Sequence, residues 1–288
     1  MLLHLAPSKF ERRTLNSAKT DKRSNSPTKS AKRRSLLVPI LIAVVAVGLI
    51  VFSLTGGDDE NSAPTATPTP TSTDNTSEPE EDFQPTQPEP SDEEIDEMVA
   101  ELSTFSHREA DDPLAMGDVD APLVMIVYSD FQCPFCGEWA RTTMPVLVEK
   151  YVDSGDLRIE WRDMAVLGNG SQDAALAGRA AANQGKFWEF SDVLYDEEWQ
   201  AAATDDSYGA EAMADIAVDL GMDREQFLAD IADADTEAAV EADRDEAWSI
   251  GFTGTPAFLV EGLPVMGAQP LDTFESAIEK RLGEVQEN

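Results

Sequence analysis

The longest apolar stretch of the sequence runs from Leu36 to Leu54, and none of its 19 residues is charged. At about 1.5 Å of rise per residue, a helix of this length crosses the roughly 30 Å hydrocarbon core of a bilayer. Pro39 falls in the first turn, where the missing N–H costs little. The length and the charged flanks of the run argue against a buried core helix. The pattern therefore predicts one transmembrane helix at 36–54.

A cleaved signal peptide has a similar arrangement, because it also places a basic stretch before an apolar core. Its apolar region covers only about 7 to 15 residues and ends at a cleavage site of the A-x-A form. No such site follows Leu54. The membrane helix is therefore the favoured interpretation, and the cleaved signal is its alternative.

Two polar segments flank the predicted membrane helix. Residues 55–95 consist mostly of Thr, Pro, Ser, Asp and Glu, as in APTATPTPTSTDNTSEPEE. A segment with so few large apolar side chains cannot bury enough surface to offset its ordering entropy, so we expect a disordered linker. Residues 1–35 are rich in Ser and Lys and lack apolar periodicity, which also predicts disorder. The remaining residues, 96–288, suit one folded domain.

The folded domain begins with patterns typical of an α/β protein. Residues 122–129 (PLVMIVYS) are apolar and partly β-branched, which predicts a buried strand. A helical pattern continues to about Asp153 and contains Pro145, which is expected to kink the helix. Residues 157–164 (LRIEWRDM) alternate between apolar and polar side chains and predict a second strand. The apolar stripe of the helix comprises Trp139, Met144, Leu147, Val148 and Tyr151.

An Ala-rich helical block follows at about 171–250. Its periodicity predicts at least three helical pieces, at 173–195, 208–220 and 223–250, and the last of these is expected to break near Asp235. The larger apolar side chains of the block are expected in its core; they are Phe187, Trp188, Phe190, Leu194, Ile216, Leu220, Phe227 and Leu228.

The end of the chain returns to strands. Residues 256–260 and 263–266 are apolar and are separated by Glu261-Gly262, which predicts a β-hairpin. Residues 271–282 have the spacing of a closing amphipathic helix.

Charge is distributed unevenly along the chain. The net charge is −35, and residues 1–35 hold ten Lys or Arg against two acidic residues, which leaves −43 on the remainder. The basic flank of a membrane helix stays in the cytoplasm. We therefore expect a single-pass cell-membrane protein with a cytoplasmic amino terminus and an extracytoplasmic domain. So acidic a surface argues against binding to nucleic acid or to anionic lipid.

Both cysteines of the chain lie in the stretch DFQCPFCGEW, as Cys133 and Cys136. Outside the cytoplasm such a pair can oxidise. A zinc site is disfavoured, because zinc takes about four ligands and the only histidines are His4 and His107. A structural staple is disfavoured because so short a loop constrains little unfolded-chain entropy. A reactive redox pair is the remaining interpretation.

The chemistry of this pair follows from its expected place at a helix start. Unpaired backbone N–H groups and the positive end of the helix dipole lower the pKa of a thiol there, which makes Cys133 the nucleophile. Cys136 lies one turn later, within disulfide reach and more buried. It is expected to attack the mixed disulfide that Cys133 forms with another protein. Pro134 fits an early helical position.

The order of elements is strand, helix, strand, helical block, strand, strand, helix. With YSDFQCPFC at the end of a strand and GTPAFLV late in the chain, residues 113–282 resemble the DsbA-like branch of the thioredoxin superfamily. The resemblance is to the membrane-anchored kind found in Gram-positive, actinobacterial species. It implies an α/β thioredoxin-like fold with an inserted helical subdomain, preceded here by the membrane helix and the linker.

The resemblance also implies roles for individual residues. Thr255 and Pro256 match the position at which the family places a cis-proline that faces the cysteines and offers backbone groups to a client; the sequence does not decide the isomer. Asp130 is the candidate for proton transfer or for tuning the pair, and Glu160 is a second candidate. For each of them a merely hydrogen-bonded carboxylate is the alternative.

The aromatic residues near the pair have less direct expected roles. Phe131, Phe135 and Trp139 are expected to pack around the site, and Phe135 is grouped with Thr255 and Pro256 as substrate-binding. Phe135 also stands where strongly oxidising members of the family have histidine. A milder oxidant is therefore expected.

The sequence thus predicts a thiol-disulfide oxidoreductase that donates a disulfide to reduced secreted proteins and is reoxidised by a membrane partner. No cofactor is expected. A reductase or isomerase is the alternative among enzymes, and a tethered binding or chaperone module is the alternative among non-enzymes.

Overall fold

The computed structural model describes residues 91–287. The predicted membrane helix at 36–54, the basic segment 1–35 and most of the linker 55–95 lie outside this part of the chain. Among the described helices, none has the length and apolar character needed to cross a bilayer.

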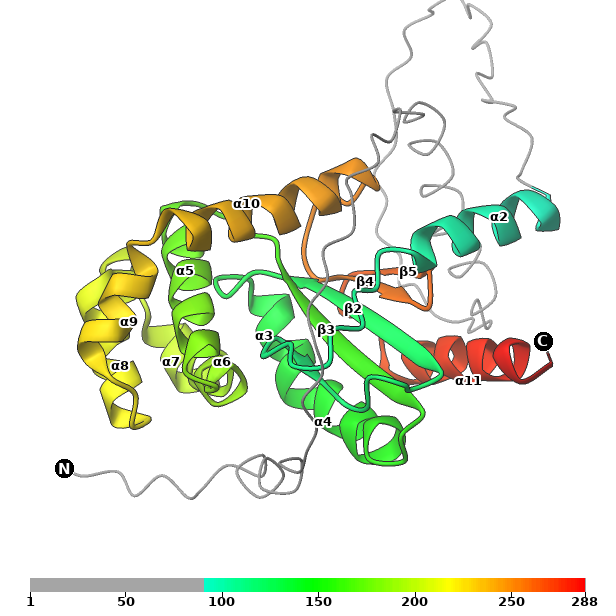
Figure 1. Cartoon of the computed structure of the whole chain (residues 1–288), viewed down its shortest axis with the longest axis horizontal. Coiled ribbons are helices and arrows are strands. Elements are labelled where there is room, and N and C mark those ends of the chain that lie inside the picture. The colour runs from blue at the N-terminus through cyan, green and yellow to red at the C-terminus, as the bar shows by residue number, and fades with distance from the viewer. Residues whose placement is uncertain (1–90, 288) are drawn as a thin grey trace, which may run out of the picture.

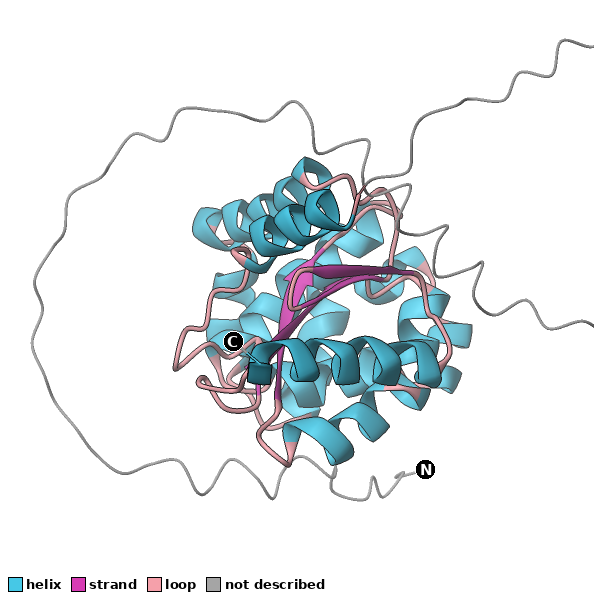
Figure 2. Cartoon of the chain, turned by 90° about the vertical axis from the view of Figure 1, so that its right-hand side faces the viewer, coloured by secondary structure: helices cyan, strands magenta, loops and turns pink. Residues whose placement is uncertain are grey.

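The described residues form a five-stranded mixed sheet in the order β1-β3-β2-β4-β5. The central strand β2 (Leu123–Ser129) pairs in parallel with β3 (Leu157–Asp163) and antiparallel with β4 (Ala257–Val260). The two edge strands, β1 (Ala115–Met116) and β5 (Leu263–Met266), each pair antiparallel with their neighbour. Figure 2 shows the strands in the interior with helices around them. The thioredoxin-like fold predicted from the sequence is confirmed.

Both faces of the sheet are covered, which explains why β2 is apolar at nearly every position. Alternate side chains of a strand point to opposite faces. Met125 and Val127 contact one core together with α3 (Pro134–Thr142) and α11 (Leu271–Glu287). Val124, Ile126 and Tyr128 instead contact residues of α2 (Asp92–Ser103) and α10 (Ala234–Ser249).

The helix after the cysteines is interrupted close to Pro145, as the sequence predicts. The first part, α3, ends at Thr142, and α4 (Met144–Leu147) begins again with Pro145 among its first residues. A π-helical turn, η3 (Val148–Val152), completes the segment. The predicted apolar stripe of this helix is buried throughout; it comprises Trp139, Met144, Leu147, Val148 and Tyr151.

The helical block lies at one end of the sheet, on the side opposite the carboxyl-terminal helix α11 (Figure 1). The predicted helix 173–195 is in fact two helices, because the chain turns at Gly185, whose φ of 67° is left-handed. The last predicted piece, 223–250, also divides, at Asp233, which caps the helix that follows. The elements of the block are α5 (Asn169–Asn183), α6 (Phe187–Leu194), α7 (Glu197–Ala202), η4 (Asp205–Tyr208), α8 (Ala210–Asp219), α9 (Arg224–Ile231) and α10.

The predicted core of the block is partly right. Phe187, Phe190, Leu194 and Phe227 are buried, whereas the other four residues are only partly buried and pack against the cluster from its edge; they are Trp188, Ile216, Leu220 and Leu228.

The hairpin agrees with its prediction. Glu261 and Gly262 join β4 and β5, and both have left-handed backbones, with φ of 45° and 82°. Two such residues make the turn type that matches the twist of a hairpin. The closing helix α11 extends to Glu287, beyond the predicted end at 282.

The amino-terminal helix α2 was not predicted, and it begins at Asp92, within the range assigned to the linker. The Ser91 side chain accepts a hydrogen bond from the Glu94 N–H, and the Glu94 carboxylate accepts one from the Ser91 N–H at 2.8 Å. This capping box fixes the start of the helix. Met98, Val99 and Leu102 of α2 then pack on the sheet.

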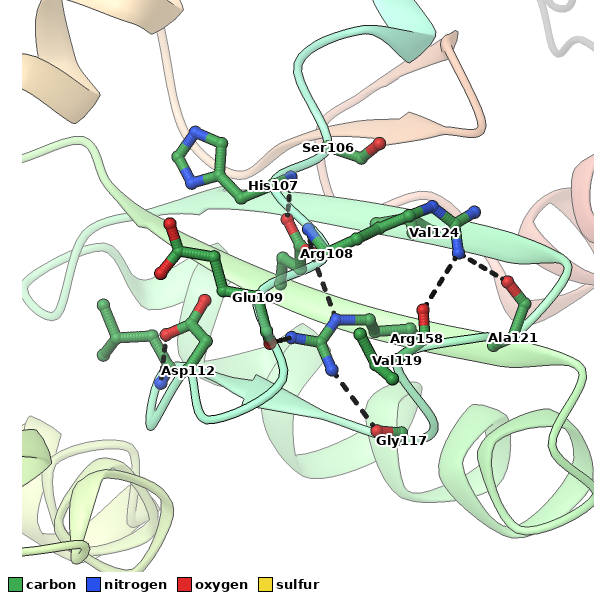
Figure 3. A network of polar contacts seen from close by, with 12 residues as sticks. Ser106, His107, Arg108, Glu109, Asp112, Gly117, Val119, Ala121, Val124 and Arg158 are labelled. Carbon is green, nitrogen blue, oxygen red and sulfur yellow. Dashed lines mark hydrogen bonds and ion pairs between the residues drawn. The ribbon is translucent and has the colours of Figure 1, made fainter. Parts of the chain in front are cut away.

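The strand β3 differs from its predicted one-sided pattern, because all seven of its residues are buried. Its polar side chains pair with one another: Arg158 Nε and Arg162 Nη2 donate to Glu160 at 3.1 and 3.0 Å. Figure 3 shows the loop before β1 lying over Arg158, and the His107 and Arg108 N–H groups of this loop donate to the Glu160 carboxylate at 2.9 and 2.8 Å. Buried charge is tolerated where it is paired and hydrogen-bonded in this way.

Candidate active site

The two cysteines lie at the start of α3, directly after the carboxyl end of β2. Cys133 is the N-cap residue, with an extended backbone, and Pro134 takes an early helical position. Unpaired N–H groups and the helix dipole therefore favour a thiolate at Cys133. Cys136, one turn later, has no exposed surface, and Cys133 is 4% exposed.

A loop from the far end of the sequence brings Thr255 and Pro256 to the cysteines. The peptide bond between these two residues is cis. The Cys133 thiol donates a hydrogen bond to the Thr255 carbonyl at 3.3 Å. The structure thus places Thr255 beside Cys133, as the resemblance implied, although the two residues are 122 positions apart.

Both cysteines are free thiols. Their surroundings shift the two pKa values in opposite directions. A hydrogen bond from the Cys136 thiol is the main reason that the pKa of Cys133 is lowered to about 6; burial opposes the shift, and the Thr255 side chain assists it. For Cys136, burial first and the neighbouring Cys133 second raise the pKa well above its usual value. At neutral pH, Cys133 is therefore a thiolate and Cys136 a thiol.

This geometry agrees with the comparisons to known proteins. A family model described as Thioredoxin matches residues 109–280. The chain is 31% identical over 176 residues to the probable disulfide bond formation protein D of Bacillus cereus, across 58% of this chain and 78% of that protein. The chain is a DsbA-like thiol-disulfide oxidoreductase of the thioredoxin family.

Solved structures share the fold of the oxidoreductase. Oxidised BdbD from Bacillus subtilis aligns with a TM-score of 0.55 at 22% identity, over 61% of this chain and 95% of that one. Wolbachia pipientis alpha-DsbA1 aligns with a TM-score of 0.54 at 22% identity, over 60% and 92%. At this level of identity the likeness concerns the fold alone.

One further relative matches only in part. The Na(+)/H(+) antiporter NhaA 3 of Salinispora tropica is 32% identical to the oxidoreductase over 164 residues, but the match covers 24% of that protein. The similarity is therefore to one segment of a longer protein, and the antiporter name carries no implication for this chain.

The difference in acidity between the cysteines gives a first testable prediction. The rate at which iodoacetamide alkylates the reduced oxidoreductase should titrate with a midpoint near the Cys133 pKa of about 6. Cys136→Ala should raise this midpoint, because it removes the hydrogen bond that contributes most to the shift. The Cys133→Ala variant is the control and should show no fast-reacting thiol near neutral pH. A midpoint near the reference value of 9.0 in the unaltered protein would contradict this reading of the site.

Asp130 lies next to the cysteines, as expected, and is 2% exposed. Its carboxylate accepts hydrogen bonds from the N–H groups of Gln132, Val166 and Leu167 at 2.8, 2.9 and 3.2 Å. Its main-chain carbonyl accepts the Cys133 N–H at 3.0 Å. These bonds make Asp130 an organiser of the loop that carries the cysteines; a role in proton transfer stays a prediction.

Glu160, the second candidate, belongs instead to the buried network on β3. Burial works against its ionisation, but the His107 and Arg108 N–H groups, together with the neighbouring arginines, lower its pKa to about 2. A carboxylate that remains ionised at neutral pH does not carry a proton between thiols. The structure therefore corrects this assignment: Glu160 is an ion-pair residue of the fold.

The predicted packing of the aromatic residues is right for Phe131 and Trp139, which are 1% and 2% exposed. It is wrong for Phe135, which is 62% exposed beside Cys133. An exposed aromatic ring there is consistent with the other expectation, that Phe135 contacts a client, because large exposed apolar side chains often mark binding surfaces.

The helical block holds the active-site loop in place. The Phe131 ring packs between Trp161, Phe187 and Tyr195, with centroid distances of 5.1, 6.3 and 5.2 Å. Gln200 of α7 donates to the Phe131 carbonyl at 3.1 Å. The residues that precede Cys133 are therefore anchored in the block rather than in the sheet alone.

Sequence reasoning missed two hydroxyl groups close to Cys136. Ser129 is the last residue of β2, and Tyr195 directly follows α6; their hydroxyls are 2.8 Å apart and both residues are buried. A polar residue at the end of an apolar strand, next to the cysteine loop, was an available signal for Ser129. No local pattern marks Tyr195, because it reaches the site only through folding of the block.

Proposed function

We propose that this oxidoreductase donates the Cys133–Cys136 disulfide to reduced proteins outside the cytoplasm. The observation that supports the proposal most strongly is the opposed acidity of the two thiols, with the Cys133 pKa lowered to about 6. A stabilised thiolate favours the reduced form of the pair, so the oxidised form has a stronger tendency to accept electrons.

The reaction proceeds in two exchanges. A client thiolate attacks the Cys133 sulfur; the new bond joins the client to Cys133, and the electron pair of the broken bond leaves on Cys136, which then takes up a proton. Another thiolate of the same client then attacks the client sulfur of this mixed disulfide, and Cys133 leaves as a thiolate. The client loses two electrons and the pair gains them. The low pKa of Cys133 makes it a good leaving group in the second exchange.

The surface around Cys133 suits an unfolded client. Phe135 and Leu167 are 62% and 54% exposed, the two largest values among the large apolar side chains that are exposed in the described residues. Phe135 lies two positions after Cys133, and the Leu167 N–H bonds to Asp130 beside it. Thr255, whose carbonyl accepts the Cys133 thiol, offers backbone groups beside the same sulfur. We propose that the apolar side chains bind the client while Thr255 and Pro256 align its backbone.

The direction of electron flow is tested by the reduction potential. The purified full-length chain, equilibrated against glutathione buffers, should have a potential of about −120 to −180 mV, which is the range of strong oxidants and isomerases. Because Phe135 replaces the histidine of the most oxidising relatives, we expect a value nearer to about −180 mV than to about −120 mV. A potential near about −270 mV would instead indicate a reductase.

The location of the domain is a separate proposal. We infer that residues 36–54 anchor the chain with its cysteines outside the membrane, on the basis of the apolar run and the basic residues that precede it. Because the chain has only two cysteines, a membrane-impermeant maleimide should label the reduced protein in intact cells. The doubly substituted variant Cys133→Ser, Cys136→Ser is the control. Labelling that occurs only after lysis would place the cysteines inside the cell and contradict the proposed topology.

The same proposal assigns a partner. DsbA-like proteins act on substrate proteins and are reoxidised by another protein. A domain tethered near the membrane would meet a reoxidising partner there, and we propose that this partner is a membrane protein.

A further inference from the structure

The two hydroxyl groups close to Cys136 have no part in the mechanism above. Ser129 and Tyr195 are 3% and 2% exposed, and their oxygens are 2.8 Å apart. Tyr195 Oη can also donate to the Asp130 carbonyl at 3.2 Å. Cys136 and Tyr195 belong to the same buried cluster, and a hydrogen bond from the Ser129 side chain counteracts the burial that raises the Cys136 pKa. The four groups form a short chain from the buried sulfur to the backbone that holds Cys133.

This chain has two hydrogen-bonding arrangements. A carbonyl cannot donate, so when Tyr195 donates to Asp130 its oxygen accepts from Ser129. The Ser129 proton then points away from Cys136, whose own thiol proton is donated to Cys133. When Tyr195 instead donates to Ser129, the Ser129 hydroxyl proton is free to point at Cys136. Rotation of two hydroxyls thus suits both the thiol and the thiolate, without moving the backbone.

Cys136 needs such a group because it has no access to water. When the disulfide opens, the electron pair of the broken bond leaves on a sulfur with no exposed surface. Burial disfavours the charged form of any group. It also raises the pKa of the Tyr195 phenol well above its usual value, so that this hydroxyl keeps its proton.

We propose that Ser129 donates a hydrogen bond to the Cys136 thiolate as it leaves, and that Tyr195 positions Ser129 for this. Ser129 is then a catalytic residue, because it contacts a reacting atom, and Tyr195 is a positioning residue. No proton is transferred from either hydroxyl; each only reorients. The role holds for attack by any thiol, and therefore does not depend on whether clients are oxidised or reduced.

The test is the rate at which dithiothreitol opens the oxidised pair in the full-length protein. Ser129→Ala should slow this rate about tenfold or more, because a hydrogen bond to a charged group is lost. Ser129→Thr keeps the hydroxyl and should restore most of the rate. Tyr195→Phe keeps the ring that packs on Phe131 and should slow opening by a smaller factor, about threefold.

A second readout separates this role from a general disturbance of the site. The alkylation midpoint of Cys133 should stay the same in Ser129→Ala, because Cys133 receives its stabilisation from other groups. The proposal is overturned if Ser129→Ala opens at the unaltered rate, or if Ser129→Thr is equally slow. It is also overturned if the Cys133 midpoint moves with the opening rate. If Ser129→Ala does not fold, Tyr195→Phe and Ser129→Thr decide: an unaltered rate in Tyr195→Phe contradicts the proposal.

Discussion

Cys133→Ser is expected to abolish disulfide donation, with a loss of roughly 10³-fold or more in the rate of client oxidation. A serine hydroxyl forms no disulfide, so the variant has no bond to transfer. The measurement is the oxidation of a reduced test protein with free thiols followed over time. Because Cys133 is buried at the N-cap and Ser is a favourable N-cap residue, the variant should fold as the unaltered protein does.

Cys136→Ser is the matched variant and should behave differently. Its Cys133 thiolate can still attack a disulfide in an oxidised test protein, which is the reverse of donation, but no second thiol is present to release the product. A mixed disulfide should therefore accumulate and be visible on a non-reducing gel. If Cys133→Ser oxidises clients at the unaltered rate, the catalytic assignment is wrong. If it merely binds them as before, the chain acts as a tethered binding module.

The second large effect concerns stability rather than chemistry. Glu160→Gln should lower the free energy of unfolding by about 3–5 kcal/mol, because it leaves Arg158 and Arg162 charged in the interior. All three side chains are 3% exposed or less. Urea unfolding of the two proteins measures the difference. Glu101→Gln, on the exposed face of α2, removes the same charge and should change stability by less than about 0.5 kcal/mol.

The same residue predicts a dependence on pH. The Glu160 pKa is about 2 in the folded protein, below the reference value of 4.5. A lowered pKa contributes stability that is fully present above the unfolded-state pKa and is lost as the pH falls through the folded-state pKa. The unaltered protein should therefore lose this contribution between about pH 4.5 and pH 2, and Glu160→Gln should lack that part of the acid transition. An equal acid transition in both proteins would contradict the ion-pair assignment.

The sequence predicted those parts of the fold that local pattern decides. The buried strand before the cysteines, the break near Pro145 and the Glu261-Gly262 hairpin each follow from a few adjacent residues, and the structure has all three. The helix α2 was missed although its Ser-x-x-Glu capping signal was present, because the acidic residues around it resemble the linker.

The errors arose where distant residues decide the outcome. The alternation of LRIEWRDM predicts one polar face, but Glu160 accepts N–H bonds from a loop 53 and 52 positions away, which allows that face to be buried. The active-site residues likewise fall into those that the sequence identified and those that it did not. The cysteines and Thr255-Pro256 were found because they have a recognisable motif, whereas Tyr195 joins them only through tertiary packing.

The anchoring of Phe131 in the helical block has a consequence for how such a protein diversifies. The loop before Cys133 accepts a hydrogen bond from α7 and packs on rings from β3 and α6. Substitutions in these elements, although far from the cysteines in sequence, should therefore shift the loop that carries Cys133. Redox behaviour can therefore be adjusted from outside the Cys-Pro-Phe-Cys tetrapeptide. For protein engineering, the inserted helices therefore offer positions at which the reduction potential of the cysteine pair can be changed while the pair itself is kept.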